Sequence, residues 1–446
     1  MEDIKHQSDM DLESYFMGFT PNRLFKRKPR LFERAEGNYL YGSNGEKVFD
    51  GFSGLWCSGM GHCHPKIAEA VGRQMRELDY VAAFNMSHPK AFRLAERIGA
   101  MAPGDLNHVF FTTGGSDAVD TALKIATGYH RLKGDATRFR MIGRERGYHG
   151  VGFGGISVGG MVANRKMFAT LMIPGVDHLP HTHSLPDMAF SKGQPNWGAH
   201  LASDLERLVA LHDASSIAAV IVEPMAGSTG VLVPPTGYLE ALRRICTKHG
   251  ILLIFDEVIC GFGRMGENFA AQRFNVKPDM ITFAKTVTNG TQPLGGVIMT
   301  DEIFNTFMTT PEQQNTIFHG YTYSAHPVAV AAACAALDIF EEEGVPARVR
   351  ALERTFEELI HSLKGEPNVV DVRNIGLGAG VEFAPIDGKP GQRGYQVTEA
   401  LLDRGFYSRW TGDNATLAPP FFSTESELAQ MIETMRQVIR EHATMN

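Results

Sequence analysis

The apolar positions in the middle of the chain form short continuous runs, and segments with helical spacing lie between them. Short continuous apolar runs are typical of strands buried on both faces of a parallel sheet. The expected strands are 109–112, 217–222, 251–255, 280–284 and 294–299. The expected helices are 116–131, 237–249 and 325–340. Strands that alternate with helices predict a doubly wound α/β architecture.

The two ends of the chain carry a different pattern. Residues 38–50 predict a hairpin of two short strands around a Ser-Asn-Gly turn, and Pro65 opens a helical pattern. The helices expected near the ends are 65–78, 345–363 and 426–445, and the strand candidates are 369–372 and 377–383. We therefore expect a large domain over 76–335 and a small α+β domain built from both chain ends, 1–75 and 336–446.

Composition narrows the class of protein. A chain of 446 residues with 43% hydrophobic residues is long enough for such a two-part organisation. A net charge of −7 argues against a nucleic-acid partner. The first sixteen residues lack the apolar segment of a secretory signal, and the longest apolar stretch, Val328–Leu337, is too short to cross a membrane. The five scattered cysteines favour a reducing compartment, so we expect a soluble cytoplasmic protein without a membrane partner.

Three segments carry candidate chemistry, and the first is Thr112–Lys124. Here a strand ends, Gly114 and Gly115 permit a tight turn, and a helix begins at about Ser116. A helix N-terminus offers free N–H groups and the positive end of a dipole, which together bind phosphate. The same pattern is also typical of a simple helix cap.

The other two segments place charged groups after expected strands. Asp256 and Glu257 follow the strand 251–255, at the edge of an α/β sheet where ligands bind. Lys285 follows the strand 280–284 and enters a loop of Thr, Asn and Gly. A lysine in a cleft can form a Schiff base. Taken singly, the acid could be structural and the lysine a surface residue.

Together the three segments supply a phosphate cup, an acid for a pyridinium nitrogen and a Schiff-base lysine, which is the set that pyridoxal phosphate needs. The stretch Leu252–Gly290 resembles the lysine-site signature of the class III aminotransferases, and the resemblance covers essentially the whole chain. It implies pyridoxal-phosphate fold type I: a large domain with a mainly parallel seven-stranded sheet flanked by helices, plus a small α+β domain. It also implies that Lys285 is the covalent anchor and catalytic base.

The resemblance assigns further cofactor-binding roles. Gly115 and Ser116 bind the phosphate, Asp256 binds the ring nitrogen, and Tyr148 and Val258 cover the two ring faces. His149 belongs to the same Gly-Tyr-His-Gly loop as Tyr148, and Glu223 helps to hold the ring and loops. Thr322 binds the phosphate of the neighbouring subunit, which implies a homodimer, with a homotetramer as a further option.

Within this family the chain is most similar to the ω-amino acid–pyruvate aminotransferases, and among these to the β-alanine–pyruvate enzymes. Three segments carry this likeness: 54–57, 223–231 and 409–420. The resemblance implies a ping-pong transfer of an amino group from an ω-amino acid, such as β-alanine, or a primary amine to pyruvate. Arg409 would grip the pyruvate carboxylate with two parallel bonds and swing away for a plain amine. The candidates for the substrate pocket are Phe19, Leu55, Trp56, Phe84, Tyr148 and Ser228, although core packing explains several of them equally well.

The chain departs from the family pattern at two places. Thr113–Asp117 replaces the commoner Ser-Gly-Ser-Glu form of the cup, and Lys285-Thr286-Val287 replaces Lys-Gly-Leu. Backbone donors and Ser116 remain, so the reaction type is unaffected.

Other functions are weaker alternatives. Another pyridoxal enzyme of this fold, a decarboxylase or an aminomutase, is the main one, and a catalytically silent binding protein is a second. His62-Cys63-His64 lacks the spacing of a zinc site, so no metal is expected. The glycines at 152–155 do not form a dinucleotide fingerprint.

Overall fold

A central seven-stranded sheet organises the large part of the molecule in the computed structural model, which describes residues 10–443. The strand order is β4-β10-β9-β8-β7-β5-β6. The strands are β4 (Leu106–Thr112), β5 (Arg140–Arg144), β6 (Val176–Leu179), β7 (Ile217–Val222), β8 (Leu252–Asp256), β9 (Met280–Phe283) and β10 (Gly295–Thr300). Strand β10 runs antiparallel to both of its neighbours, whereas β9, β8, β7, β5 and β6 pair in parallel. The expectation of a mainly parallel seven-stranded sheet is therefore confirmed.

The side chains of each central strand divide between two hydrophobic cores. In β7, Val220 and Val222 join one core, whereas Ala219 and Ile221 join the other. This division follows from the period of two in a strand, which sends successive side chains to opposite faces of the sheet. Because both faces are covered, the strand has no polar position, and this explains its continuous apolar sequence.

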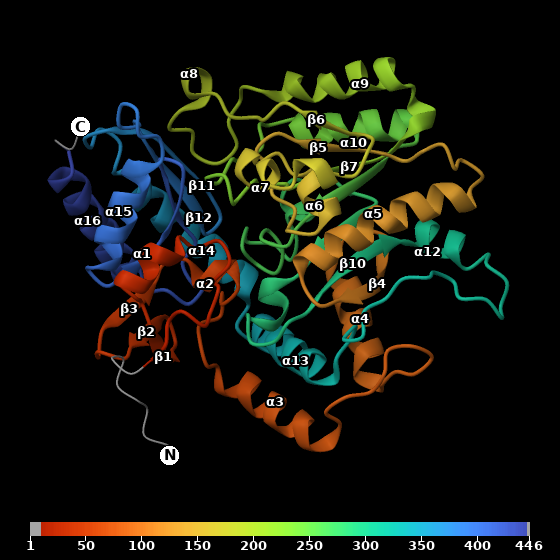
Figure 1. Cartoon of the computed structure of the whole chain (residues 1–446), viewed down its shortest axis with the longest axis horizontal. Helices are drawn as coiled ribbons and strands as arrows, with labels where there is room; N and C mark the ends of the chain where they lie inside the picture. The colour runs from red at the N-terminus through yellow and green to blue at the C-terminus, as the bar shows by residue number, and fades with distance from the viewer. Residues whose placement is uncertain (1–9, 444–446) are drawn as a thin grey trace.

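Helices cover both faces of this sheet (Figure 1). α5 (Gly115–Leu132) and α12 (Asp301–Phe307) pack on one face, and α4 (Pro89–Met101), α10 (Tyr238–His249) and α13 (Pro327–Glu342) contribute to the core on the other. The shorter helices of this part are α6 (Phe153–Val158), α7 (Val162–Lys166), α8 (Leu185–Met188), α9 (Asp204–His212) and α11 (Ala270–Arg273).

The two ends of the described chain lie together beside the large sheet, as the red and blue elements of Figure 1 show. One small sheet has the order β1-β2-β3-β13, and its last pair joins the N-terminal hairpin to a C-terminal strand in parallel. The other small sheet is antiparallel, with the order β11-β12-β15-β14. The strands are β1 (Phe32–Glu36), β2 (Tyr39–Gly42), β3 (Lys47–Asp50), β11 (Val369–Ile375), β12 (Gly378–Phe383), β13 (Phe406–Tyr407), β14 (Arg409–Thr411) and β15 (Asn414–Leu417).

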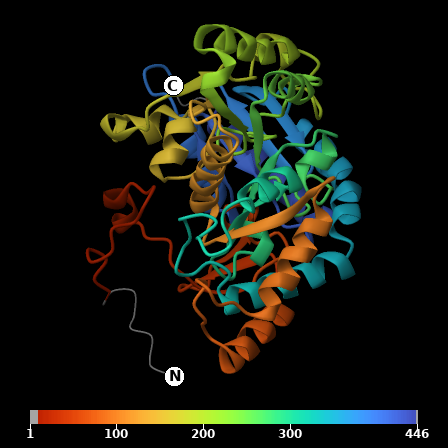
Figure 2. The same cartoon turned by 90° about the vertical axis from the view of Figure 1, so that its right-hand side faces the viewer.

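The remaining helices lie beside these small sheets, except α3, which packs against α13 of the large part. They are α1 (Asn22–Arg27), α2 (Ser53–Trp56), α3 (Pro65–Glu77), α14 (Val345–His361), α15 (Gln392–Leu402) and α16 (Glu425–Glu441). Figure 2 shows the N-terminal segment around α1 standing out from the side of the molecule. Ion pairs of Lys28 and Arg30 with Asp403 tie the end of this segment to the C-terminal part.

Most elements expected from the sequence are present, with ends that coincide or are shifted by up to four residues. The hairpin at 38–50 corresponds to β2 and β3, and the alanine-rich helix begins at Pro327 rather than at residue 325. The helix expected to reach residue 445 ends at Glu441, and residues 444–446 lie outside the described chain. Among the described residues, no helix is long and apolar enough to cross a membrane.

Candidate active site

The candidate site residues follow the carboxyl ends of neighbouring strands in the large sheet. Glu223 comes directly after β7, Asp256 ends β8, and Lys285 comes two residues after β9. Helix α5 begins just after β4, and the loop with Tyr148 and His149 follows β5. These strands all point the same way, so their carboxyl ends meet at one edge of the sheet, where ligands bind in α/β proteins.

Asp256 is buried and held by three donors. Its Oδ2 lies 2.7 Å from His149 Nδ1, and its Oδ1 accepts from Thr282 Oγ1 at 3.0 Å and from the Val258 amide at 3.2 Å. His149 is also buried, and its other ring nitrogen, Nε2, has no hydrogen-bond partner. A carboxylate fixed from three directions can orient a cationic ring nitrogen without moving.

Lys285 lies at the start of a 3-10 turn with a left-handed backbone, φ +58°. Its Nζ donates to the Leu55 carbonyl at 3.0 Å, which brings the N-terminal segment 53–57 against the lysine. The next residue repeats this link, because Thr286 Oγ1 donates to the Trp56 carbonyl at 3.1 Å. Thr282, which bonds Asp256, lies three residues before Lys285, so the same strand end positions the acid and the amine.

The N-terminus of α5 forms a tightly packed cradle. Its cap residue, Gly114, supplies no side-chain hydrogen bond to the first turn. A Cβ at Gly115 would lie 2.9 Å from Val258 Cγ1, so only glycine fits beside that side chain. Gly150 has φ +91°, and a Cβ there would lie 2.5 Å from Ser116 Oγ. Ser116 Oγ also accepts from the Val151 amide at 3.1 Å. The uncapped amides and this glycine-lined space fit a phosphate group.

The acids around the site have different tasks. Glu223 is buried and accepts from the Tyr148 amide at 2.9 Å and the Gly227 amide at 3.2 Å. Burial, aided by the charge of Asp256, raises the pKa of Glu223 to about 7. Burial also raises the pKa of Glu257 to about 8, but this carboxyl accepts from the Ala270 and Ala271 amides and so caps α11. The acidic pair after β8 therefore contains one site acid and one structural acid.

Arg409 approaches the same site from the small antiparallel sheet. It lies in β14, and burial raises the pKa of Tyr407 although the Arg409 charge acts to lower it. Burial raises the pKa of Tyr148, as do the negative charges of Asp256 and Glu223, whereas the Arg409 charge acts in the opposite direction.

The other pocket candidates occupy different surroundings. Leu55 is half exposed beside Lys285, whereas Trp56 is buried, packs edge-on against Phe52 and lies under the Arg264 guanidinium. The backbone carbonyl of Ser228 accepts from Thr411 Oγ1 at 2.7 Å, which joins the Ser228 loop to the strand that carries Arg409.

Phe19, Phe84 and Thr322 are exposed in this chain and stand outside the buried cluster. Phe84 packs against Gly320, and the Thr322 carbonyl accepts from Tyr80 Oη at 3.1 Å. Phe84 and the exposed rings of Phe318 and Tyr323 make an apolar surface around the 318–323 loop.

Sequence reasoning missed Thr282 and the buried ion-pair cluster of Asp371, Arg373 and Glu382. A polar side chain inside the apolar strand 280–283 was a usable signal for Thr282. No local sequence pattern predicted the ion-pair cluster. His62, from the dismissed zinc motif, pairs instead with Asp50 at 2.7 Å.

Strand order, strand-end acid, loop lysine and uncapped helix start together define a pyridoxal-phosphate enzyme of fold type I, as the sequence indicated. Comparison with known proteins agrees. The family model of the class-III aminotransferases matches residues 24–439. An ω-aminotransferase of Caulobacter vibrioides is 54% identical over 96% of this chain and 98% of its own length. A β-alanine–pyruvate aminotransferase of Pseudomonas aeruginosa is 48% identical over 97% of this chain and 96% of its own.

A solved structure shows the same fold. The ω-transaminase of Pseudomonas jessenii in complex with PMP superposes with a TM-score of 0.92, at 30% identity over 97% of each chain. The chain belongs to the class III aminotransferases, so it is an aminotransferase and pyridoxal phosphate is its cofactor.

Proposed function

We propose that the chain transfers an amino group from an ω-amino acid such as β-alanine, or from another primary amine, to pyruvate in a ping-pong reaction. The support is that relatives 48% to 54% identical over nearly their whole length are named as an ω-aminotransferase, a β-alanine–pyruvate aminotransferase and an ω-amino acid–pyruvate aminotransferase. A decarboxylase or an aminomutase of the same fold is not favoured by these relatives.

The residues divide the work of the cofactor site. Pyridoxal phosphate supplies the aldehyde that carries the amino group and the ring that accepts electrons. Lys285 would hold the cofactor through its aldehyde and, once the donor amine has displaced it, its free Nζ would move the proton at the substrate carbon. Asp256, oriented by His149 and Thr282, would bind the ring nitrogen. Gly115 and Ser116 would bind the phosphate at the start of α5.

Two side chains cover the ring and one acid holds the loop above it. Val258 packs at Gly115, which supports a role for it in covering one ring face, and Tyr148 would cover the other. Glu223 fixes Tyr148 through its backbone amide.

One observation carries the proposal: a continuous chain of contacts joins the phosphate cradle to the lysine. Gly115 touches Val258, whose amide bonds Asp256, and Asp256 bonds Thr282 in the strand that ends at the Lys285 turn. Lysine, acid and cradle are thereby fixed in one frame, as a cofactor attached at three points requires.

Arg409 provides selectivity for the acceptor in this proposal. Pyruvate carries a carboxylate next to its carbonyl, which a guanidinium can bind through two parallel bonds. A plain amine has no such group, so Arg409 is needed in one half-reaction only. Leu55, Trp56, Phe19, Phe84 and Ser228 remain our candidates for the walls of the substrate pocket.

We further propose that the enzyme works as a homodimer. The exposed apolar surface formed by Phe84, Phe318 and Tyr323 is of the kind that marks an interface. Thr322 lies in the middle of it and would reach the phosphate of the second subunit. We also propose that the domains are residues 1–75, 76–335 and 336–446. The five free cysteines support a cytoplasmic location.

The decisive experiment replaces Lys285 with alanine. We expect the loss of both alanine formation from pyruvate and the visible absorbance of bound cofactor. Lys248→Ala is the matched control, because Lys248 is an exposed lysine paired with Glu206. Full turnover by Lys285→Ala would refute the proposal. A panel of amines with pyruvate then identifies the donor. If no amine in the panel gave alanine, the proposal that pyruvate is the acceptor would be refuted.

The dimer is tested by Phe318→Asp, with Leu211→Asp on α9 as a control at another exposed apolar side chain. We expect only Phe318→Asp to halve the mass measured by light scattering and to weaken cofactor binding. An unchanged mass would count against the interface.

A further inference from the structure

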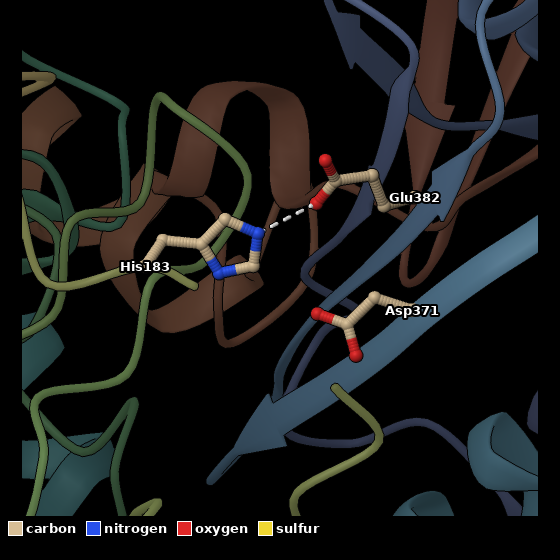
Figure 3. Close-up of side chains that lie close together, drawn as sticks. All are labelled: His183, Asp371 and Glu382. Carbon is tan, nitrogen blue, oxygen red and sulfur yellow. Dashed lines mark ion pairs between the residues drawn. The ribbon is translucent and has the colours of Figure 1, made fainter. Parts of the chain in front are cut away.

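The strongest unexplained feature is a largely buried ion-pair cluster in the small antiparallel sheet. Arg373 Nη1 lies 2.5 Å from Asp371 Oδ2 and 2.7 Å from Glu382 Oε2. His183 Nε2 adds a contact of 3.1 Å to the same Glu382 oxygen, as Figure 3 shows. The two acids lie in β11 and β12 of the small sheet, and His183 comes from the loop after β6 in the large part.

The side chains of His183, Asp371 and Glu382 have the geometry of a partial metal site, but the position of Arg373 argues against a bound metal ion there. The potential ligand atoms of His183, Asp371 and Glu382 lie within 4.8 Å of one another. A guanidinium hydrogen-bonded to both carboxylates already supplies the positive charge there. Burial raises the pKa of Glu382, but His183 and Arg373 outweigh that effect and lower it to about 2.

The rest of the Arg373 side chain faces the loop 226–232, which an isolated bridge between Ala226 and Leu232 closes. Arg373 Nε donates to the Gly230 carbonyl at 2.8 Å. With the Asn414 amide in its hydrogen-bonding orientation, Arg373 Nη2 donates to the Asn414 side-chain oxygen at 2.5 Å. Arg373 thus joins the loop to β15, which pairs with the Arg409 strand.

Each of three successive carbonyls in this loop is held by a side chain from a different element. Thr411 of β14 donates to Ser228 at 2.7 Å, Arg146 after β5 donates to Thr229 at 3.1 Å, and Arg373 of β11 donates to Gly230 at 2.8 Å. The packing is also close: a Cβ at Gly380 of β12 would lie 2.4 Å from the Gly230 carbonyl oxygen. The loop therefore has little freedom relative to the β14–β15 hairpin.

We propose that Arg373 is a positioning residue for the acceptor half-reaction, and that Arg373 and Thr411 are two straps that hold the 226–232 loop against the hairpin that carries Arg409. Asp371 and Glu382 balance the Arg373 charge so that the guanidinium can be buried. The inference rests on the proposed role of Arg409 in binding the pyruvate carboxylate. If these contacts are lost, Arg409 shifts relative to the pocket. The binding of pyruvate, the substrate that needs Arg409, should then weaken.

The test separates the two half-reactions in single turnover. Arg373→Lys keeps the charge but loses the planar fork that reaches Gly230 and Asn414 together. Thr411→Val removes one hydroxyl with almost no change in shape. For both variants we expect the apparent dissociation constant for pyruvate to rise on the order of 10- to 100-fold. The rate with benzylamine, which has no carboxylate, and the affinity of the apo chain for cofactor should stay unchanged.

Two further variants distinguish the possible failures. Arg409→Lys is the reference: if it leaves pyruvate binding unchanged, the proposed function of Arg409 fails. If Arg409→Lys weakens pyruvate binding but Arg373→Lys and Thr411→Val do not, the strap inference alone fails. Arg436→Lys is the matched control, because Arg436 also bonds a carboxylate and a carbonyl but lies in α16.

Other outcomes would also overturn the inference. An equal loss in both half-reactions would show a general structural role. Stoichiometric Zn²⁺ binding that His183→Ala abolishes would show a metal site instead. If Arg373→Lys does not fold, Thr411→Val carries the test, because it tests the second strap directly.

Discussion

Gly150→Ala tests the position of the phosphate cradle most directly. Gly150 has φ +91°, and a Cβ at this position would lie 2.5 Å from Ser116 Oγ and 2.7 Å from Ser116 Cα. Real Cβ atoms do not approach so closely, so the contact between Gly150 and the start of α5 must open. Because Ser116 and Gly115 are the proposed phosphate donors, this movement should weaken cofactor binding.

The size of the effect follows from two terms. A side chain at positive φ costs roughly 1–2 kcal/mol, and forcing extra volume into a packed site costs roughly 1–3 kcal/mol more. Gly134→Ala isolates the first term, because Gly134 has φ +89° with no atom within 4 Å of a Cβ. The difference between the variants corresponds to a roughly 5- to 150-fold weaker cofactor affinity for Gly150→Ala.

The assay is a titration of the apo variants with pyridoxal phosphate, followed by absorbance, with thermal unfolding of each apo chain as the measure of strain. Both variants should unfold at lower temperature than the wild type, but only Gly150→Ala should bind the cofactor more weakly. If Gly150→Ala and Gly134→Ala bound the cofactor equally well, the phosphate would not lie at the Ser116–Gly150 contact, and the reasoning would be wrong.

Three further predictions concern buried acids. Asp256→Asn keeps an oxygen for Thr282 and Val258 but loses the charge, so single-turnover rates should fall roughly 10- to 150-fold; an unchanged rate would argue against its role. The pKa of Glu223 is raised from 4.5 to about 7, so its contribution to stability is complete below about pH 4.5 and falls by about 3 kcal/mol as the pH rises through 7. Denaturation of the apo chain should show this slope, and Glu223→Gln should remove it. The pKa of Glu382 is lowered from 4.5 to about 2, so the advantage of wild type over Glu382→Gln, at most about 3 kcal/mol, should be present above pH 4.5 and shrink towards pH 2; a pH-independent difference would contradict the ion-pair assignment.

The sequence predicted the strands buried on both faces most accurately. The expected strand 217–222 coincides with β7, because six consecutive buried apolar residues leave no other pattern. Strands β5 and β6 were missed. β5 begins and ends with arginine, and β6 is the four residues Val-Asp-His-Leu at the sheet edge, so neither contains an apolar run.

Strand direction could not be predicted from the same signal. β10 is fully buried and apolar like β7, yet it runs antiparallel to both neighbours. A strand covered on both faces has the same composition in either direction, so its orientation depends on the connections. The loop 284–294 between β9 and β10 is too short for a helical crossover, and this brings the chain straight back beside β9.

The cofactor half of the site, with Asp256 and Lys285, can be recognised from local sequence, whereas the substrate half, with Arg409, cannot. Asp256 and Lys285 each follow an apolar strand directly, so pattern and chemistry occur together and can be recognised. Arg409 lies on a three-residue strand whose place depends on Arg373, Asn414 and the 226–232 loop, which are far apart in the sequence.

This difference has a consequence for how selectivity changes. Substitutions at the contact between the 226–232 loop and the β14–β15 hairpin should alter the register of Arg409 while leaving the Lys285–Asp256 frame intact, because the Arg373 bonds reach neither Lys285 nor Asp256. The acceptor pocket can therefore vary independently of the cofactor chemistry. Variants at Thr411 or Asn414 should change the preference among keto acids before they change cofactor affinity, and the reverse order would show that the halves are mechanically coupled.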